Sequence, residues 1–216
     1  MEKIITENAK YYLEEVKKIN KNAQIIAVSK TISPEIVNIA TNCGINAIGE
    51  NRVQEFLTKF DDYECKNVHF IGHLQTNKVK NIIDKVSLIQ SVDSLKLAEC
   101  INDFSKKLDI TKEILIQINI SNEENKSGIN PLDADEFIQK IQTFSNIKAR
   151  GFMTIPKNTD DYELETYFDK MHEIYSSYPQ FDILSMGMTN DFKLALKHGS
   201  TMVRIGSGLF KQKIAP

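Results

Sequence analysis

The sequence has few cysteines, no excess of one charge and no long hydrophobic run, and each absence argues against a class of protein. Its three cysteines are odd in number and far apart, with no CxxC pair, which argues against a disulfide framework and against a zinc site. With 27 basic and 29 acidic residues, the net charge of −2 provides no overall attraction to nucleic acid. No apolar stretch approaches the roughly 18 residues that span a bilayer.

The amino terminus also lacks the apolar core and cleavage site of a signal peptide, because its first seven residues mix acids with bases. We therefore expect a cytoplasmic protein. No glycine- or proline-rich linker divides the 216 residues, and 41% of them are hydrophobic, which suffices for a sizeable core. The sequence predicts one compact domain over residues 1–216.

Short apolar runs alternate with helical patterns along the whole chain. An amphipathic helix is expected over 3–19, then an apolar run at 24–28, then a helix that Ser33 and Pro34 begin. The same alternation then repeats. Further strands are expected at 47–49, 68–72, 87–92, 113–118, 147–153, 181–185 and 202–205, and further helices at 52–60, 76–85, 94–107, 131–144, 161–176 and 190–198.

This pattern contains about eight β units, most of them followed by a helix. Apolar strands separated by helices are typical of parallel strands that are buried on both faces. Eight such units in roughly 200 residues is the number found in a closed barrel. An open doubly wound sheet is the alternative, but five or six strands are usual there. The predicted fold class is α/β, a single (β/α)8 TIM barrel with an extra N-terminal helix.

Lys30 stands just beyond the first apolar run, in the segment Ala27–Thr31. That place is the carboxyl end of the first strand, the face on which barrel enzymes build their sites. Lysine amines form Schiff bases with carbonyl compounds and with pyridoxal phosphate (PLP). Because the strand is apolar, we expect the ammonium to be partly desolvated, which favours its nucleophilic form. The alternative is a solvated lysine at a strand end.

Two loops follow the last two expected strands, where barrels frequently hold phosphate. Thr189 or Asn190 is expected to cap the helix after residues 185–188, so that its free N–H groups face the barrel mouth. Gly206 and Gly208 let the backbone approach an anion closely. An ordinary glycine turn is the alternative for either loop alone.

Other polar residues lie within or just past expected strands. Arg204 stands inside an apolar strand, where a charge needs an ion-pair partner or a ligand; we expect a ligand, and a salt bridge to Glu50 is the alternative. Glu50 and Asn51 either contact a cofactor or tie loops together. His73 is either a general base or a structural histidine.

Taken together, these segments resemble the YggS/PROSC family of PLP-binding proteins, often called PLP homeostasis proteins. The matching segments run in family order along the chain, at 27–31, 48–55, 69–78, 151–156, 184–191 and 199–210. The resemblance implies a single barrel similar to the N-terminal domain of alanine racemases.

The resemblance also implies a role for individual residues in binding PLP. Lys30 would carry the cofactor as a Schiff base. Ser185, with the backbone around Gly206 and Ser207, would bind its phosphate. Arg204 matches the arginine that lies near the pyridine nitrogen. No catalytic residue and no metal ligand is assigned.

Asn51 lies in a loop that borders the cofactor in the family. A few positions depart from the family pattern: Ser207 replaces a threonine, Lys211 a glycine and Phe152 a leucine, and no tryptophan precedes His69. None of these changes removes an expected cofactor contact. Lys211 alters the segment after the last strand.

The resemblance predicts a carrier or buffer in PLP homeostasis, a monomer that delivers PLP to apo-enzymes. A cationic arginine near the pyridine nitrogen disfavours its protonation, so carbanion stabilisation is expected to be weak. Alanine racemases also recruit a tyrosine base from a second domain, for which a chain ending at Pro216 is expected to have no room. The alternatives are a weak amino-acid racemase that uses Lys30 and a sugar-phosphate barrel without PLP.

Overall fold

Eight parallel strands close into a barrel in the computed structural model, which describes residues 1–211. The strands are β1 (Gln24–Val28), β2 (Ile48–Glu50), β3 (Val68–Phe70), β4 (Leu88–Val92), β5 (Lys112–Ile118), β6 (Ile147–Thr154), β7 (Ile183–Met188) and β8 (Met202–Ile205). Each strand pairs with its neighbour in sequence, and β8 pairs with β1, so the sheet has no open edge. The predicted barrel and its extra N-terminal helix are confirmed.

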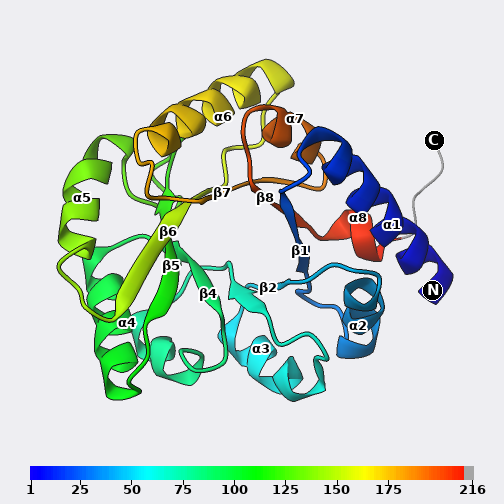
Figure 1. Cartoon of the computed structure of the whole chain (residues 1–216), viewed down its shortest axis with the longest axis horizontal. Helices are drawn as coiled ribbons and strands as arrows, with labels where there is room; N and C mark the ends of the chain where they lie inside the picture. Colours follow the sequence, from blue (N-terminus) through cyan, green and yellow to red (C-terminus); the bar gives the residue numbers. More distant parts are fainter. Residues whose placement is uncertain (212–216) are drawn as a thin grey trace.

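Helices surround the barrel in Figure 1. Within residues 1–211 the α-helices are α1 (Glu2–Ile19), α2 (Pro34–Asn42), α3 (Val53–Lys59), α4 (Leu95–Lys107), α5 (Ala134–Ile141), α6 (Asp161–Ser176), α7 (Phe192–Lys197) and α8 (Ser207–Phe210). Three short 3-10 helices lie at Phe60–Asp62, Thr76–Asn81 and Pro131–Asp133. No helix in this part of the chain is both long and apolar enough to cross a bilayer. Residues 212–216 of the predicted single domain lie outside the described residues.

One predicted helix is shorter than expected and is a 3-10 helix. The segment expected as a helix over 76–85 forms the 3-10 helix Thr76–Asn81. The Ile82 N–H donates to the Val79 carbonyl three residues back, and both side chains are fully buried. A three-residue period places both on one face. Apolar residues three and four apart do not distinguish this tighter helix from an α-helix.

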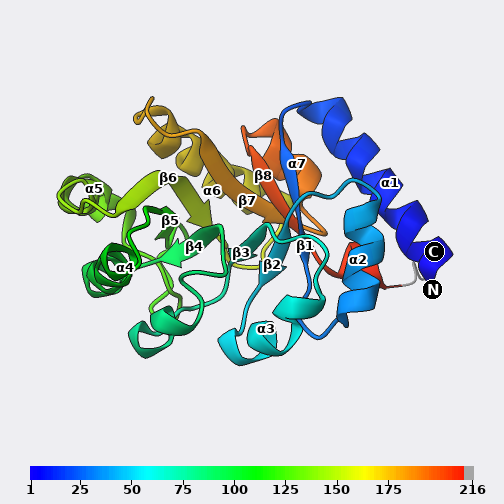
Figure 2. The same ribbon diagram turned by 60° about the horizontal axis from the view of Figure 1, so that its bottom comes forward.

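α1 packs across the place where the first and last parts of the chain meet. Its buried side chains recur at helical spacing, with Ile5, Ala9 and Val16 among them. Figures 1 and 2 both show α1 beside the short helix α8, and the Asn8 side-chain amide donates to the Leu209 carbonyl at 3.1 Å. The first helix therefore supports the last segment of the described chain.

The interior of the barrel is layered, because every second residue of a strand points inward. One layer is apolar and consists of Ile26, Ala47, Leu88, Leu115, Met153 and Met202. Two residues further along β4 and β8 come Gln90 and Arg204, both buried. Ser185 of β7 and His69 of β3 are buried as well. These four buried residues form a polar layer, in which Gln90 and Arg204 lie nearer to the carboxyl ends of the strands than the apolar layer does, while Ser185 and His69 are in register with Met202 and Leu88.

Candidate functional site

A pocket of about 510 Å³ opens beyond the carboxyl ends of β1 and β8. Its lining includes five of the six predicted cofactor-binding residues, namely Lys30, Asn51, Arg204, Gly206 and Ser207. Residues so far apart in sequence meet because β1 and β8 are hydrogen-bonded neighbours, with Ala27 opposite Ile205. The closure of the barrel thus builds the pocket.

Lys30 lies in a turn that follows β1. The side chain is exposed, and within residues 1–211 its amine makes neither a hydrogen bond nor an ion pair. The predicted desolvation of this ammonium is wrong, because β1 ends at Val28 and Lys30 stands two residues beyond the buried strand. The amine is therefore available to a ligand in the pocket.

The backbone next to Lys30 is held in an uncommon conformation. Thr31 has a φ of 64°, in the left-handed region that β-branched residues rarely adopt. Its N–H donates to the Glu55 carboxylate at 2.5 Å, and the Ile32 N–H donates to the Ser29 carbonyl at 3.0 Å. These contacts fix the turn that presents Lys30.

Glu50 lies fully buried beneath this turn and does not line the pocket. Its Oε1 accepts from the Ser29 hydroxyl at 2.7 Å and from the Tyr63 hydroxyl, and it lies 3.9 Å from the Lys59 amine. Burial raises the pKa of this carboxyl, although the hydroxyl donors act in the opposite direction. Of the two roles expected for Glu50, these contacts are those of a residue that ties loops together.

Thr189 joins the two loops that follow β7 and β8. Its hydroxyl oxygen accepts from the Gly206 N–H and from the Gly208 N–H, both at 3.3 Å. A Cβ at position 208 would overlap the Tyr12 hydroxyl and lie 2.8 Å from the Thr189 methyl carbon. Gly208 is therefore required for packing between α1 and the loop.

The predicted cap of the helix after β7 is wrong. α7 begins at Phe192, so Asp191 is its N-cap residue, and neither Thr189 nor Asn190 caps it. The reason is that the Asp191 carboxylate turns back and accepts from the Met188 N–H. Burial raises the pKa of Asp191. Thr189 is left free to hold the neighbouring loop instead.

Arg204 is 3% exposed and has no carboxylate partner at ion-pair distance within residues 1–211, so the alternative of a salt bridge to Glu50 is wrong. Its Nη1 donates to the Ser185 carbonyl at 2.9 Å and to the Ser185 hydroxyl at 2.7 Å. Its Nη2 donates to the Thr154 carbonyl at 2.8 Å. Burial lowers its pKa to about 10, an effect that the Asp191 carboxylate opposes, so the guanidinium remains charged at neutral pH.

Ser185, the sixth predicted residue, does not line the pocket. It is fully buried, and its hydroxyl donates to the Gln90 side-chain oxygen at 2.7 Å. The sequence suggested a strand ending at residue 185, whereas β7 continues to Met188. Ser185 therefore lies within the barrel, and Thr189 stands at the pocket in its place.

Several residues that line the pocket were not assigned to it from the sequence: Ile71, Asn158, Met188, Thr189, Asp191 and Lys211 among them. For Thr189 the sequence does contain a signal, because the residue follows a strand in the same segment, but a threonine in that place also predicts a helix cap. No comparable signal marks Asn158, which reaches the pocket from the loop after β6.

His73 lies outside the pocket. Its Nδ1 is 3.4 Å from an oxygen of Asp93 and 3.3 Å from the Ser127 hydroxyl. A proton relay through a histidine needs one partner on each ring nitrogen. Since Asp93 and Ser127 both contact Nδ1, these three residues do not form such a relay. Within residues 1–211, no group of three His, Cys, Asp or Glu side chains is arranged to hold a metal.

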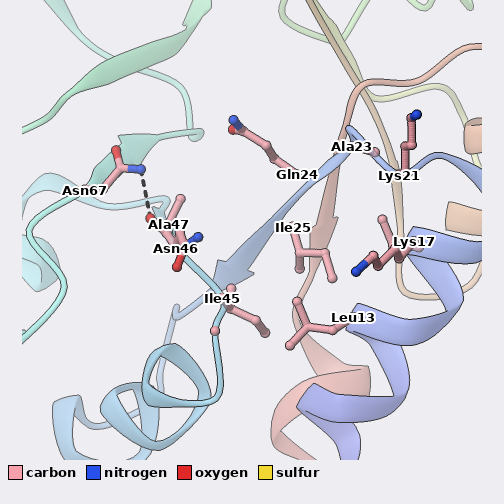
Figure 3. A pocket seen from close by; sticks show the side chains of 12 residues that line it. Leu13, Lys17, Lys21, Ala23, Gln24, Ile25, Ile45, Asn46, Ala47 and Asn67 are labelled. Atoms are coloured by element: carbon pink, nitrogen blue, oxygen red, sulfur yellow. Dashed lines mark hydrogen bonds between the residues drawn. The ribbon is translucent and has the colours of Figure 1, made fainter.

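A second pocket, of about 490 Å³, lies at the other end of the barrel. Figure 3 shows it between α1, which contributes Leu13 and Lys17, and the segments around Ile25 and Ile45. None of the predicted site residues lines it. Because ligands of barrel proteins bind at the carboxyl ends of the strands, the pocket with Lys30 is the candidate site.

The residues of the Lys30 pocket fit PLP, the cofactor that the sequence resemblance implies. The amine of Lys30 suits an aldehyde, and the guanidinium of Arg204 suits an acceptor atom. The Asn51 side-chain oxygen is buried without a hydrogen-bond partner, so the site holds an unused acceptor. Apolar atoms of Val28 and Ile71 offer contacts for a ring.

Comparison with known proteins gives consistent results. Residues 4–213 match the family described as alanine racemase, N-terminal domain. The pyridoxal phosphate homeostasis protein of Aquifex aeolicus is 39% identical over 199 residues, which cover 88% of this chain and 87% of that protein. The structure of PipY from Synechococcus elongatus with PLP bound superposes with a TM-score of 0.81 at 28% identity, covering 92% of this chain and 99% of PipY. An alanine racemase of Clostridium difficile shares the fold, with a TM-score of 0.78 at 16% identity over 97% of this chain and 58% of the racemase.

Proposed function

Because this chain belongs to the alanine racemase N-terminal domain family, and within it to the pyridoxal phosphate homeostasis proteins, we propose that it binds PLP reversibly at Lys30 and serves as a PLP carrier or buffer. The observation that carries the proposal is the meeting of Lys30, Arg204 and the Gly206–Ser207 loop around one pocket. The structure of PipY with PLP bound supports the choice of ligand.

Each part of the pocket has a role in this proposal. When bound, PLP supplies an aldehyde and an electron-withdrawing ring. The Lys30 amine would hold the aldehyde carbon covalently, with loss of water, and Thr189 with the Gly206–Ser207 loop would hold the phosphate. Arg204 would donate to the ring nitrogen, and Asn51 would contact the ring. Ser185 acts through Arg204, since its hydroxyl accepts from that guanidinium at 2.7 Å.

The same residues favour retention of the cofactor over catalysis. A charged guanidinium disfavours a proton on a nitrogen beside it, and an unprotonated ring stabilises a carbanion poorly. Among the described residues that line the pocket there is no tyrosine and no histidine. The pocket therefore offers few groups for proton transfer to a bound amino acid.

Addition of PLP, followed by borohydride reduction and peptide mass analysis, tests the proposal. We expect a visible absorption band and a label on Lys30, and we expect Lys30→Ala to lose both. Lys211→Ala is the matched control, because Lys211 also lines the pocket, and it should keep the band and the label. A label on Lys211, or no band in the wild-type protein, would contradict the proposal. The latter result would favour a barrel that binds a sugar phosphate.

A weak amino-acid racemase is the second candidate, and the match to the alanine racemase domain favours it. The same preparation decides between the two functions. Turnover of L- or D-alanine that disappears in Lys30→Ala would indicate an enzyme. We expect the PLP-loaded protein to show little or none.

We further propose that the chain acts as a single PLP-binding domain over residues 1–216, as a cytoplasmic monomer that hands PLP to apo-enzymes. If transfer is direct, the loaded protein should reactivate an apo-enzyme faster than it releases PLP to a trapping reagent. Light scattering of the loaded protein gives the mass, for which the monomer value is 24.6 kDa.

A further inference from the structure

A chain of hydrogen bonds crosses the polar layer inside the barrel. It begins at Arg204 of β8, whose Nη1 donates to the Ser185 hydroxyl oxygen at 2.7 Å. The Ser185 hydroxyl in turn donates to Gln90 Oε1 at 2.7 Å, and Gln90 Nε2 lies 2.9 Å from His69 Nδ1. All four residues are buried, and they come from four different strands.

The direction of each bond in this series follows from the atoms that meet. An arginine has donors only, so the Ser185 oxygen accepts, and the Ser185 hydroxyl donates its single proton to Gln90 Oε1, which can only accept. The Gln90 oxygen is thereby an acceptor, and its amide nitrogen is the donor to His69. Gln90 Nε2 also contacts the sulfur of Met202 at 3.2 Å, as a donor would. His69 therefore accepts at Nδ1 and carries its proton on Nε2.

This series of hydrogen bonds contains no carboxylate, although a glutamate would fit into it by size. A glutamate at position 90 would have nearly the shape of Gln90 and would bring a negative charge into the layer of Arg204. An amide restrains the serine without neutralising the guanidinium. His69 is neutral as well, since burial lowers its pKa to about 4. The hydrogen bonds that orient Arg204 are thus all to neutral groups, and the carboxylate that acts on its charge is Asp191, which has no ion-pair contact with it among the described residues.

We propose that Gln90 and His69 are positioning residues, which act through Ser185 to hold the Arg204 guanidinium in one orientation at the pocket. Only the identity of the ligand that Arg204 faces rests on the proposed function. Neither Gln90 nor His69 lines the pocket, so any effect they have on a ligand passes through Arg204.

The orientation of Arg204 can be measured without any ligand, by NMR of protein with labelled arginine and histidine at neutral pH. We expect the Arg204 Nη atoms to give separate signals in the wild-type protein, because hydrogen bonds restrict their exchange, and we expect Gln90→Leu to merge them. His69 should show a protonated Nε2. Met153→Leu, a buried substitution in the apolar layer, is the control and should leave the Arg204 signals unchanged. Unchanged signals in Gln90→Leu, or a proton on His69 Nδ1, would overturn the proposal.

A double-mutant cycle on PLP affinity tests the path through Arg204. We expect Gln90→Leu to weaken PLP binding about ten-fold when Arg204 is present, the order of one hydrogen bond to a charged group. In the Arg204→Gln background the same change should have almost no effect. Equal losses in both backgrounds, or no loss in either, would refute the role of Gln90. If Gln90→Leu does not fold, Ser185→Ala interrupts the chain at the next residue.

The PLP-binding measurement and the NMR measurement test separate claims. If the wild-type protein binds no PLP, the proposed function is wrong, and the NMR signals of the free protein still decide whether Gln90 orients Arg204.

Discussion

Arg204 and His69 share one polar layer, and burial lowers the pKa of both, yet only one of them is charged at neutral pH. The pKa of Arg204 falls to about 10, which is still well above neutral pH, and the Asp191 carboxylate opposes the effect of burial. The pKa of His69 falls to about 4, and within residues 1–211 its one side-chain hydrogen bond is with the neutral Gln90 amide. The ordinary pKa of each side chain therefore decides which residue is the cation of the site.

The stability of the protein should depend on pH through His69. Its folded-state pKa of about 4 lies below the ordinary 6.5, so the folded state binds fewer protons between these values. This contribution is fully present above pH 6.5 and is lost as the pH falls toward 4, by up to about 3 kcal/mol. His69→Gln keeps an acceptor for Gln90 and should flatten the profile. Urea unfolding across this range measures the difference.

His73→Gln is the matched control for this prediction, because the His73 side chain is 60% exposed. The His73→Gln profile shows what replacing an exposed histidine does, and the change in the His69→Gln profile should be larger than that. A His69→Gln profile that runs parallel to the wild-type profile would contradict the prediction.

At the scale of single residues, the sequence indicates which residues are candidates for the site better than it indicates where their side chains lie. Lys30 and Arg204 could be found because a lysine after a strand and an arginine within one are conspicuous in apolar surroundings. The family resemblance implies Ser185 as a phosphate-binding residue, but whether Ser185 or Thr189 reaches the pocket depends on where β7 ends, and the strand runs three residues further than its apolar pattern indicates. The exposure of Lys30 likewise depends on the turn at Thr31. A left-handed position in a turn is usually indicated by a glycine, and here it is occupied by Thr31, so the sequence does not reveal the turn.

At the scale of elements, the loops after β7 and β8 form one unit. Thr189 accepts from the backbone of Gly206 and Gly208, and α8 follows directly. The two glycines differ in their surroundings. A Cβ at position 206 would lie 3.3 Å from the Val28 Cβ, which is tight, whereas a Cβ at position 208 would overlap the Tyr12 hydroxyl.

Gly208→Ala should therefore destabilise the protein by about 1–3 kcal/mol, as overpacking does, while Gly206→Ala has a smaller effect. Thermal and urea unfolding of the two variants provide the comparison. Tyr12→Phe removes the overlapping hydroxyl and should recover part of the loss when combined with Gly208→Ala. Equal stability of the two alanine variants would show that the contact with Tyr12 does not limit the loop.

The order and type of most elements followed from the sequence, because apolar strands and amphipathic helices have different periods. The exceptions are short elements. The 3-10 helix Thr76–Asn81 and the four-residue helix α8 are too short for a period to show, and their hydrogen bonds depend on contacts made elsewhere in the fold.

At the scale of the whole molecule, α1 links the beginning of the chain to the pocket. Asn8 is 5% exposed, and its amide donates to the Leu209 carbonyl at 3.1 Å and to the Lys211 carbonyl at 3.3 Å. Phe210 and Lys211 line the pocket. α1 contributes no residue to the pocket, but it supports the segment of Phe210 and Lys211, which forms one wall of the pocket.

Asn8→Ala should lower the free energy of unfolding by about 1–2 kcal/mol, because two carbonyls lose their donor. It should also weaken PLP binding, since the segment around Phe210 becomes less restrained. Unfolding curves and a PLP titration measure the two effects. Asn22→Ala, at an exposed position near the end of α1, is the control and should change neither. A loss of stability with unchanged PLP affinity would indicate that α1 does not support the pocket.

The pairing of β1 with β8 has a consequence for synthesis of the protein on the ribosome. Lys30 is translated well before Arg204 and Ser207. A nascent chain therefore displays its amine before the other walls of the pocket exist. The complete pocket forms only after the eighth strand has been translated, so capture of a vitamin B6 aldehyde between all of its walls is a post-translational event.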